Sequence, residues 1–269
     1  MKELEISVCV TTKNNIDTIE DCLKSVHGWV GEIIVVDSHS TDGTIQVCQK
    51  YGAKVYQKEF GGFADIKNHA IELASNEWVL ILDSDERIPA DLKKEIHELF
   101  PSPNKKAYRI KKRNKMFGEW MHIKHPARPL LAKKEEITYK NNYIWEELSV
   151  ISENIDTGSL DGCIEHYAYE RISEKVKKVN QYSSLQAIQD HKRNRRNTVL
   201  FYSIYGILAG FYCLFIRGAA LDGMNGLIFS VSESYQYFLV YFKRRDLNRL
   251  IRESPNSWEA IWLEEECGR

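Results

Sequence analysis

The chain has 269 residues, of which 43% are hydrophobic and 28% are charged, and these shares are typical of a folded protein with a sizeable core. Its formal net charge of -1 at pH 7 argues against wholesale nucleic-acid binding. The six cysteines include no Cys-x-x-Cys pair, so we expect neither a zinc framework nor a disulfide scaffold, only reduced packing cysteines. The N-terminal segment MKELEISVCV leads into a strand pattern without a secretory signal, which favours a cytoplasmic location.

The first hundred residues alternate between strand and helix patterns. Helices are expected from residue 15 or 17, from Asp42 to Tyr51 and over 63–74. Strands are expected at residues 6–12, 32–37, 53–57 and 77–82. This alternation predicts an α/β, Rossmann-like fold with a mostly parallel sheet flanked by helices.

Polar residues follow three of the expected strands, at Thr11–Asn14, Asp37–Ser40 and Asp83–Asp85. In doubly wound sheets, ligands bind outside the carboxyl ends of the parallel strands. We therefore expect these three segments to lie along one edge of the sheet and to form a single site.

The pattern changes after Arg87. We expect a helix over 90–99, a basic strand over 105–112 that could be only an exposed edge, and irregular sequence to about Tyr169. An amphipathic helix is expected over 172–188, followed by two apolar segments at 198–216 and 226–242. These features predict an α/β domain over residues 1–170 and a helical region over residues 171–269.

The segment Asp83-Ser84-Asp85-Glu86 supplies carboxylates directly after the most apolar strand. Such oxygens can bind Mg²⁺ or Mn²⁺ while the ion neutralises a diphosphate. Acidic residues after strands are also common as helix caps and solvated turns, so the segment by itself is a weak signal.

Neighbouring residues add to this signal. Asp37 can accept the imide N–H of a nucleobase, whereas Asp42 fits best as a helix cap. Lys67 could donate to a leaving diphosphate, although a solvated helix face is the alternative, and Asn68 could hold the local backbone.

Four segments together resemble the nucleotide-binding half of family 2 glycosyltransferases, namely ISVCVTTKNN, EIIVVDSHSTDGT, FGGFADIKNHAIELA and WVLILDSDERIP. The nearest similarity is to bacterial enzymes that extend the lipopolysaccharide core or other surface glycans with a β-linked hexose. The resemblance implies a GT-A fold with a nucleotide-sugar half over about 1–100, an acceptor half over about 101–170, and inversion at the anomeric carbon. It further implies that Thr11 and Asp37 bind the nucleoside, that Asp83 contacts the ribose or diphosphate, and that Asp85 holds the metal.

Inversion requires a general base that deprotonates the acceptor hydroxyl, and Glu146 is the candidate. Similar enzymes carry a Val-His-Glu type motif, which matches Ile144-Trp145-Glu146 with Trp145 in place of the usual His. Glu147 is the competing candidate, and a solvated loop carboxylate is the alternative for either residue.

The segment Ile164-Glu165-His166-Tyr167 resembles the family's Leu-His-Tyr segment. The resemblance implies that His166 completes the cation shell or touches the diphosphate, and an imidazole ligand favours Mn²⁺ over Mg²⁺. A polar packing role is the alternative.

The two apolar segments are bordered by Lys and Arg clusters. We expect peripheral association with the inner leaflet of the membrane, where basic residues meet anionic headgroups. A membrane span, a buried helical hairpin and a homo-oligomer interface are the alternatives.

Taken together, these patterns predict a metal-dependent inverting glycosyltransferase that moves a hexose from a nucleotide sugar, UDP-hexose above all, to a glycan or glycolipid acceptor in surface polysaccharide or lipopolysaccharide core biosynthesis. The alternative is a catalytically impaired GT-A protein that binds glycans or acts as a membrane scaffold. A dinucleotide-dependent oxidoreductase is disfavoured because no Gly-x-Gly-x-x-Gly follows the first strand.

Overall fold

A computed structural model describes residues 3–140, 147–150, 156–195 and 198–267. The chain forms two compact units. Of the described residues, the first contains 3–113, 125–140, 147–150 and 156–167, and the second contains 114–124, 168–195 and 198–267. The domain boundary at residue 170 stays a prediction, since the second unit also includes Asn114–Lys124.

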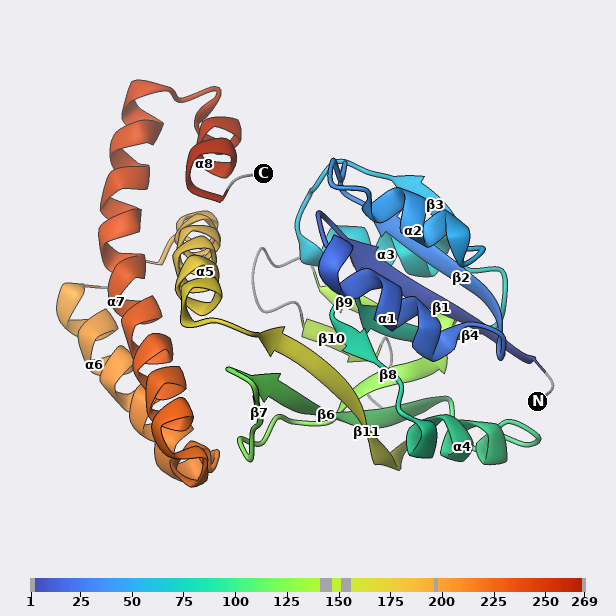
Figure 1. Ribbon diagram of the computed structural model, residues 1–269. Coiled ribbons are helices and arrows are strands. Elements are labelled where there is room, and N and C mark those ends of the chain that lie inside the picture. The colour runs from blue at the N-terminus through green and yellow to red at the C-terminus, as the bar shows by residue number, and fades with distance from the viewer. Residues whose placement is uncertain (1–2, 141–146, 151–155, 196–197, 268–269) are drawn as a thin grey trace. The chain divides into compact units, whose positions relative to one another are not determined.

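The first unit is built on the parallel strands that the sequence predicts. These run in the order β3-β2-β1-β4 and comprise β1 (Leu4–Thr12), β2 (Val30–Asp37), β3 (Lys54–Gln57) and β4 (Trp78–Asp83). They alternate along the chain with α1 (Ile16–Val26), α2 (Thr44–Lys50) and α3 (Phe63–Glu72), which lie against the sheet in Figure 1. Residues such as Val8, Ile34 and Leu80 are fully buried, as strands covered on both faces require. The predicted α/β layout is therefore confirmed.

The strand register brings the predicted polar ends together. Thr11 on β1 lies opposite Asp83 on β4, and Thr12 lies opposite Asp37 on β2. Parallel pairing in register is what makes these three carboxyl ends finish at one edge of the sheet.

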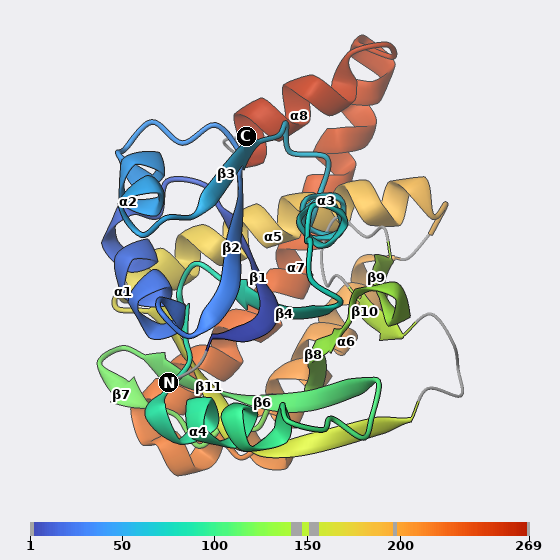
Figure 2. The same ribbon diagram turned by 90° about the vertical axis from the view of Figure 1, so that its right-hand side faces the viewer.

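An antiparallel part continues the same sheet beyond β4. It comprises β8 (Arg128–Lys133), β6 (Ala107–Met116), β11 (Thr157–Tyr169) and β5 (Glu86–Arg87), with β7 (Glu119–Trp120) paired to β6. The helix α4 (Ala90–Leu99) has the predicted bounds, and Figure 2 shows it beside β6 and β11. The 3-10 turn η1 (Lys134–Glu136) leads into β9 (Ile137–Lys140), which pairs with β10 (Glu147–Val150).

The prediction of irregular sequence up to Tyr169 is wrong, because β8, β9, β10 and β11 all lie within it. The segment of β11 contains Gly158, Asp161 and Gly162, which weaken the local strand signal. Hydrogen bonding to neighbouring strands overrides that weak propensity.

The second unit is mostly helical among its described residues, as predicted. It contains α5 (Ile172–Lys192), α6 (Val199–Phe211), the π-helical turn η2 (Tyr212–Ile216), η3 (Ala219–Asp222), α7 (Gly223–Glu253) and α8 (Trp258–Cys267). Val179, Leu185 and Ile188 of α5 are buried, but Ile172 and Val176 are exposed, so the predicted amphipathic pattern holds only beyond the first turns.

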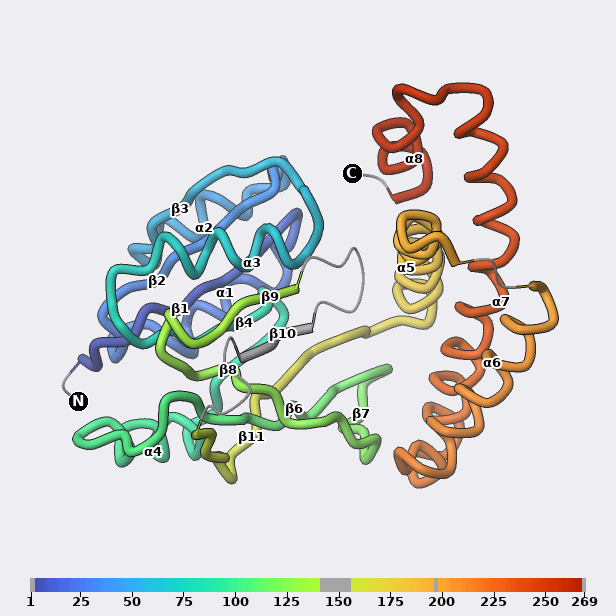
Figure 3. Tube along the Cα trace, turned by 180° about the vertical axis from the view of Figure 1, so that it is seen from behind, coloured from blue at the N-terminus to red at the C-terminus, as the bar shows by residue number. Residues whose placement is uncertain are grey.

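The helices α6 and α7 pack against each other as an antiparallel pair, which Figure 3 shows from behind. Glycines allow this approach: a Cβ atom at Gly206 would lie 2.7 Å from the Ser234 carbonyl oxygen, and one at Gly210 would lie 3.2 Å from that of Ser230. Between Val199 and Ile216, however, only Tyr202, Gly206 and Cys213 are buried. The structure therefore contradicts the alternative in which this apolar segment is buried in the core of the chain.

Candidate active site

The site begins at Asp83, the last residue of β4. Its carboxylate forms an ion pair with Lys67 on α3, with 2.7 Å between Oδ1 and Nζ, and a second cation, Lys112 on β6, lies 3.5 Å from Oδ2. Burial by itself would raise the pKa of Asp83, but the two lysines outweigh it and hold the pKa well below its ordinary value. Lys67 is almost fully buried, so its alternative as a solvated helix face is wrong.

Asp85, Glu86 and His166 form a compact group of possible metal ligands. One ligand atom from each lies within 4.8 Å of the others. The group exists because Glu86 on β5 pairs with His166 on β11, and because the backbone N–H of Tyr167 donates to the carbonyl of Asp85. His166 Nε2 lies 3.4 Å from Asp85 Oδ2. All three residues were candidates from the sequence: Asp85 and Glu86 follow each other in the acidic segment after β4, and the pairing of β11 with β5 brings His166 to them.

The pKa values in this group reflect its crowding. Burial by itself would lower the pKa of His166, but the Asp85 carboxylate outweighs it and raises the pKa. Burial raises the pKa of Glu86, and the neighbouring carboxylates add to this, while Lys112 opposes it. These are the shifts expected where several carboxylates share one site, and a bound cation would offset their mutual repulsion.

Sequence reasoning missed Lys112, which it placed on an exposed basic edge. In the structure its Nζ forms an ion pair with the buried Glu86 and lies near Asp83. Burial by itself would lower the pKa of Lys112, but Glu86 and Asp83 outweigh it and raise the pKa. A signal was available, because residues two apart on a strand share a face, and Tyr108 and Ile110 of β6 are buried.

The other expected donor-binding residues lie at the ends of β1 and β2. Asp37 is fully buried and accepts hydrogen bonds from the backbone N–H and the hydroxyl of Ser40. Thr11 is partly exposed beside Asp83 in the register. The prediction that Asp42 is the N-cap of α2 is wrong, because Gly43 takes that position; the Asp42 carboxylate instead accepts from the N–H of Thr44 at the start of α2 and from that of Ile16 at the start of α1.

Asn68 supports Lys67 from the neighbouring position of α3. Its side-chain amide donates to the carbonyl of Tyr139 at 2.9 Å and accepts from the N–H of the same residue at 2.8 Å. The Tyr139 ring in turn lies 5.3 Å from Lys67 Nζ. The helix that carries Lys67 is thus tied to β9, as the proposed backbone-holding role of Asn68 predicts.

The predicted general base, Glu146, lies outside the described residues, as does Trp145. The competing Glu147 begins β10, where its backbone lies opposite Lys140 of β9. The assignment of the base therefore stays a prediction.

Comparison with known proteins decides the family. The sequence model of "Glycosyl transferase family 2" matches residues 7–159, which include the ends of β1, β2 and β4. The chain belongs to glycosyltransferase family 2. Its mixed sheet, flanked by helices, is the GT-A fold that the resemblance implied, and this family 2 member is a glycosyltransferase.

Two relatives match this glycosyltransferase over nearly its whole length. An uncharacterised glycosyltransferase of Rickettsia prowazekii is 30% identical over 261 residues, covering 91% of this chain and 88% of its own. A lipopolysaccharide core biosynthesis glycosyltransferase, LpsC of Rhizobium meliloti, is 25% identical over 270 residues, covering 96% of this chain and 98% of its own.

Two solved structures are similar to the chain at lower identity. The Staphylococcus aureus protein TarS (residues 1–349), crystallised with UDP-GlcNAc, is 18% identical with a TM-score of 0.47 and covers 91% of this chain and 92% of its own. The mannosyltransferase PcManGT of Pyrobaculum calidifontis, solved with GDP-Man and Mn²⁺, is 15% identical with a TM-score of 0.47 and covers 97% of this chain and 79% of its own.

Proposed function

We propose that this glycosyltransferase moves a hexose from UDP-hexose to a glycan or glycolipid acceptor with inversion at the anomeric carbon, in the synthesis of lipopolysaccharide core or another surface polysaccharide. The observation that carries the proposal is the convergence of Asp83, Asp85, Glu86 and His166 with Lys67 at the carboxyl end of β4. LpsC is a core glycosyltransferase by name and aligns with almost all of this chain, which supports this class of acceptor.

The donor set of Asp85 and His166, with Glu86 beside them, fits a divalent cation. Carboxylate oxygens suit both Mg²⁺ and Mn²⁺, and the imidazole favours Mn²⁺. When bound, the cation supplies positive charge that neutralises the diphosphate of the donor. Glu86 is already paired with Lys112, so Asp85 and His166 are the principal ligands in this proposal.

Each residue at the edge of the sheet then has a role in binding or orienting the donor. Asp37 is buried at the end of β2, where its carboxylate would accept from the nucleobase. Thr11, which precedes the register partner of Asp37 on β1, would contact the nucleoside. Lys67 is held by Asp83 and would turn toward the phosphates as the leaving group gains negative charge.

The bond changes are those of a single displacement. The acceptor hydroxyl oxygen forms a bond to the anomeric carbon while the bond from that carbon to the diphosphate oxygen breaks. Glu146 would take the proton of the acceptor hydroxyl, and the nucleoside diphosphate would leave with the electron pair.

A thermal-shift assay tests the donor site. UDP with Mn²⁺ should raise the melting temperature because a ligand that binds only the folded state stabilises it, and chelation with EDTA should remove part of the rise. Asp37→Asn should reduce the rise in melting temperature that UDP produces. GDP is the control for the identity of the nucleobase. If no nucleotide stabilises the protein with or without Mn²⁺, the proposed donor site is wrong. If UDP does stabilise the protein, a panel of UDP-sugars in the same assay would identify the hexose.

A further inference from the structure

The second unit carries an extensive exposed apolar surface on α6, η2 and α7. Among the described residues, all the large exposed apolar side chains except Ile16, Tyr56, Ile172 and Val176 lie between Val199 and Phe242. By its length and composition alone, the segment Val199–Ile216 could cross a membrane, and only 17% of it is buried inside the protein. Soluble proteins rarely expose so large an apolar surface without a binding role.

On α7 the exposed apolar side chains form a single stripe. They recur at steps of three and four residues, which keeps them on one face of a helix, and they are Met224, Leu227, Val231, Tyr235, Phe238 and Phe242. At 1.5 Å per residue the stripe is about 27 Å long.

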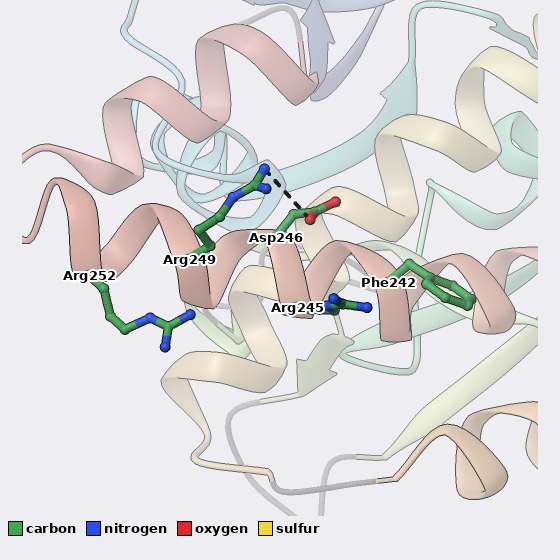
Figure 4. Close-up of a pocket in the computed structure, with 5 residues that line it drawn as sticks. All are labelled: Phe242, Arg245, Asp246, Arg249 and Arg252. Carbon is green, nitrogen blue, oxygen red and sulfur yellow. Dashed lines mark ion pairs between the residues drawn. The ribbon is translucent and has the colours of Figure 1, made fainter.

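The same stripe then changes from apolar to basic. Arg245, Arg249 and Arg252 continue the three- and four-residue steps beyond Phe242, and all three are exposed. Together with Phe242 and Asp246 they line a cavity of about 250 Å³, and Figure 4 shows these side chains following one another along α7. Asp246 lies 3.8 Å from Arg249, and the structure gives no ion pair for Arg245 or Arg252 among the described residues.

A second basic segment lies at the same end of the helix pair. Lys192, Arg193 and Arg195 precede α6 and are exposed. Arg244 on α7 donates to the Arg195 carbonyl and to the Tyr202 hydroxyl, which fixes this segment beside the basic end of α7. The formal net charge of the whole chain is -1, so any attraction to an anionic surface must come from such local clusters.

The side of α7 that is turned away from the stripe is not available to lipid. It packs against α5 through Lys175 and Glu233, whose charged atoms lie 2.6 Å apart, and Lys243 reaches the Asn180 carbonyl and Glu266 of α8. A helix pair that is charged and buried on one side and apolar on the other suits the plane of a membrane interface and not a span across it.

We propose that α6 and α7 form a membrane-docking face, in which the apolar stripe enters the acyl region and Arg245, Arg249 and Arg252 bind the phosphates of anionic headgroups. This deepens the proposed function, because it gives a glycosyltransferase of a membrane-anchored acceptor a defined lipid contact. Along α7, which lies in the plane of the interface, the change from acyl-contacting side chains to headgroup-binding arginines falls between Phe242 and Arg245.

Lipid fits this face better than a second copy of the chain. The exposed side chains of α6 include Leu200, Ile204, Tyr205, Ile207 and Phe211, which at 100° per residue cover about half of the helix circumference. A partner helix covers a narrower stripe, whereas lipid surrounds whatever is exposed. Arginines grouped at one end of the face attract anionic headgroups. A second copy of the chain would bring its own arginines to this face, and the like charges would repel each other.

The test is flotation of the full chain with vesicles of phosphatidylcholine alone and with roughly 30% phosphatidylglycerol, an anionic lipid. The triple variant Arg245→Gln, Arg249→Gln and Arg252→Gln should bind the anionic vesicles about 100-fold more weakly, since each basic residue contributes about fivefold. A matched variant, Lys94→Gln, Lys111→Gln and Lys177→Gln, removes three exposed positive charges elsewhere and should bind nearly as the parent does. Equal losses in the two triple variants would overturn the phosphate role of the arginines.

A third variant tests the apolar part of the face. Leu208→Gln, Phe211→Gln and Phe215→Gln change exposed positions of α6 and η2, so the fold should persist, as judged by circular dichroism, while vesicle binding is lost. If vesicle binding persists and this variant converts a dimer to a monomer by light scattering, the face is a contact between copies and the proposal is wrong. Absence of vesicle binding by the parent protein also overturns it. The UDP thermal shift, measured on the same samples, reports separately on the proposed donor site.

Discussion

His166 and Asp85 lie far apart in the sequence, yet His166 Nε2 is 3.4 Å from Asp85 Oδ2. The pairing of β11 with β5 produces this contact, since it aligns His166 with Glu86. The cation site proposed for this glycosyltransferase therefore depends on a strand pairing outside the parallel part of the sheet.

Replacing Asp85 by Asn should remove the Mn²⁺-dependent part of the stabilisation by UDP. Sugar transfer should fall on the order of 10²–10³-fold, because a preorganised charge at the leaving diphosphate is lost. Thermal shifts with UDP and Mn²⁺, together with a UDP-release assay, measure both effects. Asp91→Asn, an exposed position on α4, is the control. An unchanged response to Mn²⁺ in the Asp85 variant would exclude this residue as a ligand.

Replacing Lys112 by Met should destabilise the protein by about 3–5 kcal/mol, since Glu86 and Asp83 lose a buried counter-charge. Lys111→Met is the matched control: Lys111 is the exposed neighbour on the opposite face of β6, and its loss should cost within about 0.5 kcal/mol. Urea denaturation measures both free energies of unfolding.

A double variant separates charge from packing at this position. Adding Glu86→Gln to Lys112→Met removes the uncompensated carboxylate and should recover part of the lost stability. If Lys112→Met and Lys111→Met cost the same, Lys112 has no electrostatic role in the site.

Replacing Glu146 by Gln should lower sugar transfer by about 10²–10⁴-fold, as expected for loss of a general base. The stabilisation by UDP and Mn²⁺ should remain, because the base acts on the acceptor and not on the donor. Glu147→Gln is the control variant, because it removes the neighbouring carboxylate that competes for the role of the base. A larger loss of turnover in the Glu147 variant would transfer the role of the base to that residue.

Glu32 predicts a dependence of stability on pH. Burial opposes its ionisation, but hydrogen bonds from Lys54, Ser7 and Ser75 outweigh burial and lower the pKa to about 2. A carboxylate with a lowered pKa in the folded state stabilises the protein above its unfolded-state pKa near 4.5, and this contribution is lost as the pH falls from there toward 2.

Glu32→Gln should accordingly destabilise the protein at pH 7 by on the order of 2–3 kcal/mol. The difference from the parent should shrink as the pH is lowered from 5 to 3, measured by urea denaturation. Glu98→Gln, which changes an exposed carboxylate on α4, should show no such trend. A difference that stays constant with pH would contradict the assignment.

Local pattern determined the parallel part of the sheet, the half of this protein for which we propose nucleotide binding. The apolar strands ending at Thr12, Asp37 and Asp83, and the helices between them, are readable because each strand is buried and bounded by turn residues. The adjacency of their polar ends follows from the rule for parallel sheets, so Thr11, Asp37 and Asp85 could be proposed from sequence. The motif resemblance supplied the family in the same way.

Only the tertiary structure decided which other side chains join them. Lys112 reaches the site through the antiparallel strand β6, and the pairing of β11 with β5 brings His166 beside Glu86; the register and facing of these strands depend on distant partners rather than on local sequence. The sequence also did not determine whether the apolar residues of α6 and α7 are exposed, because the same composition is found in buried core helices and in surfaces that contact lipid. Sequence periodicity specifies which residues share a face, but only packing specifies what that face meets.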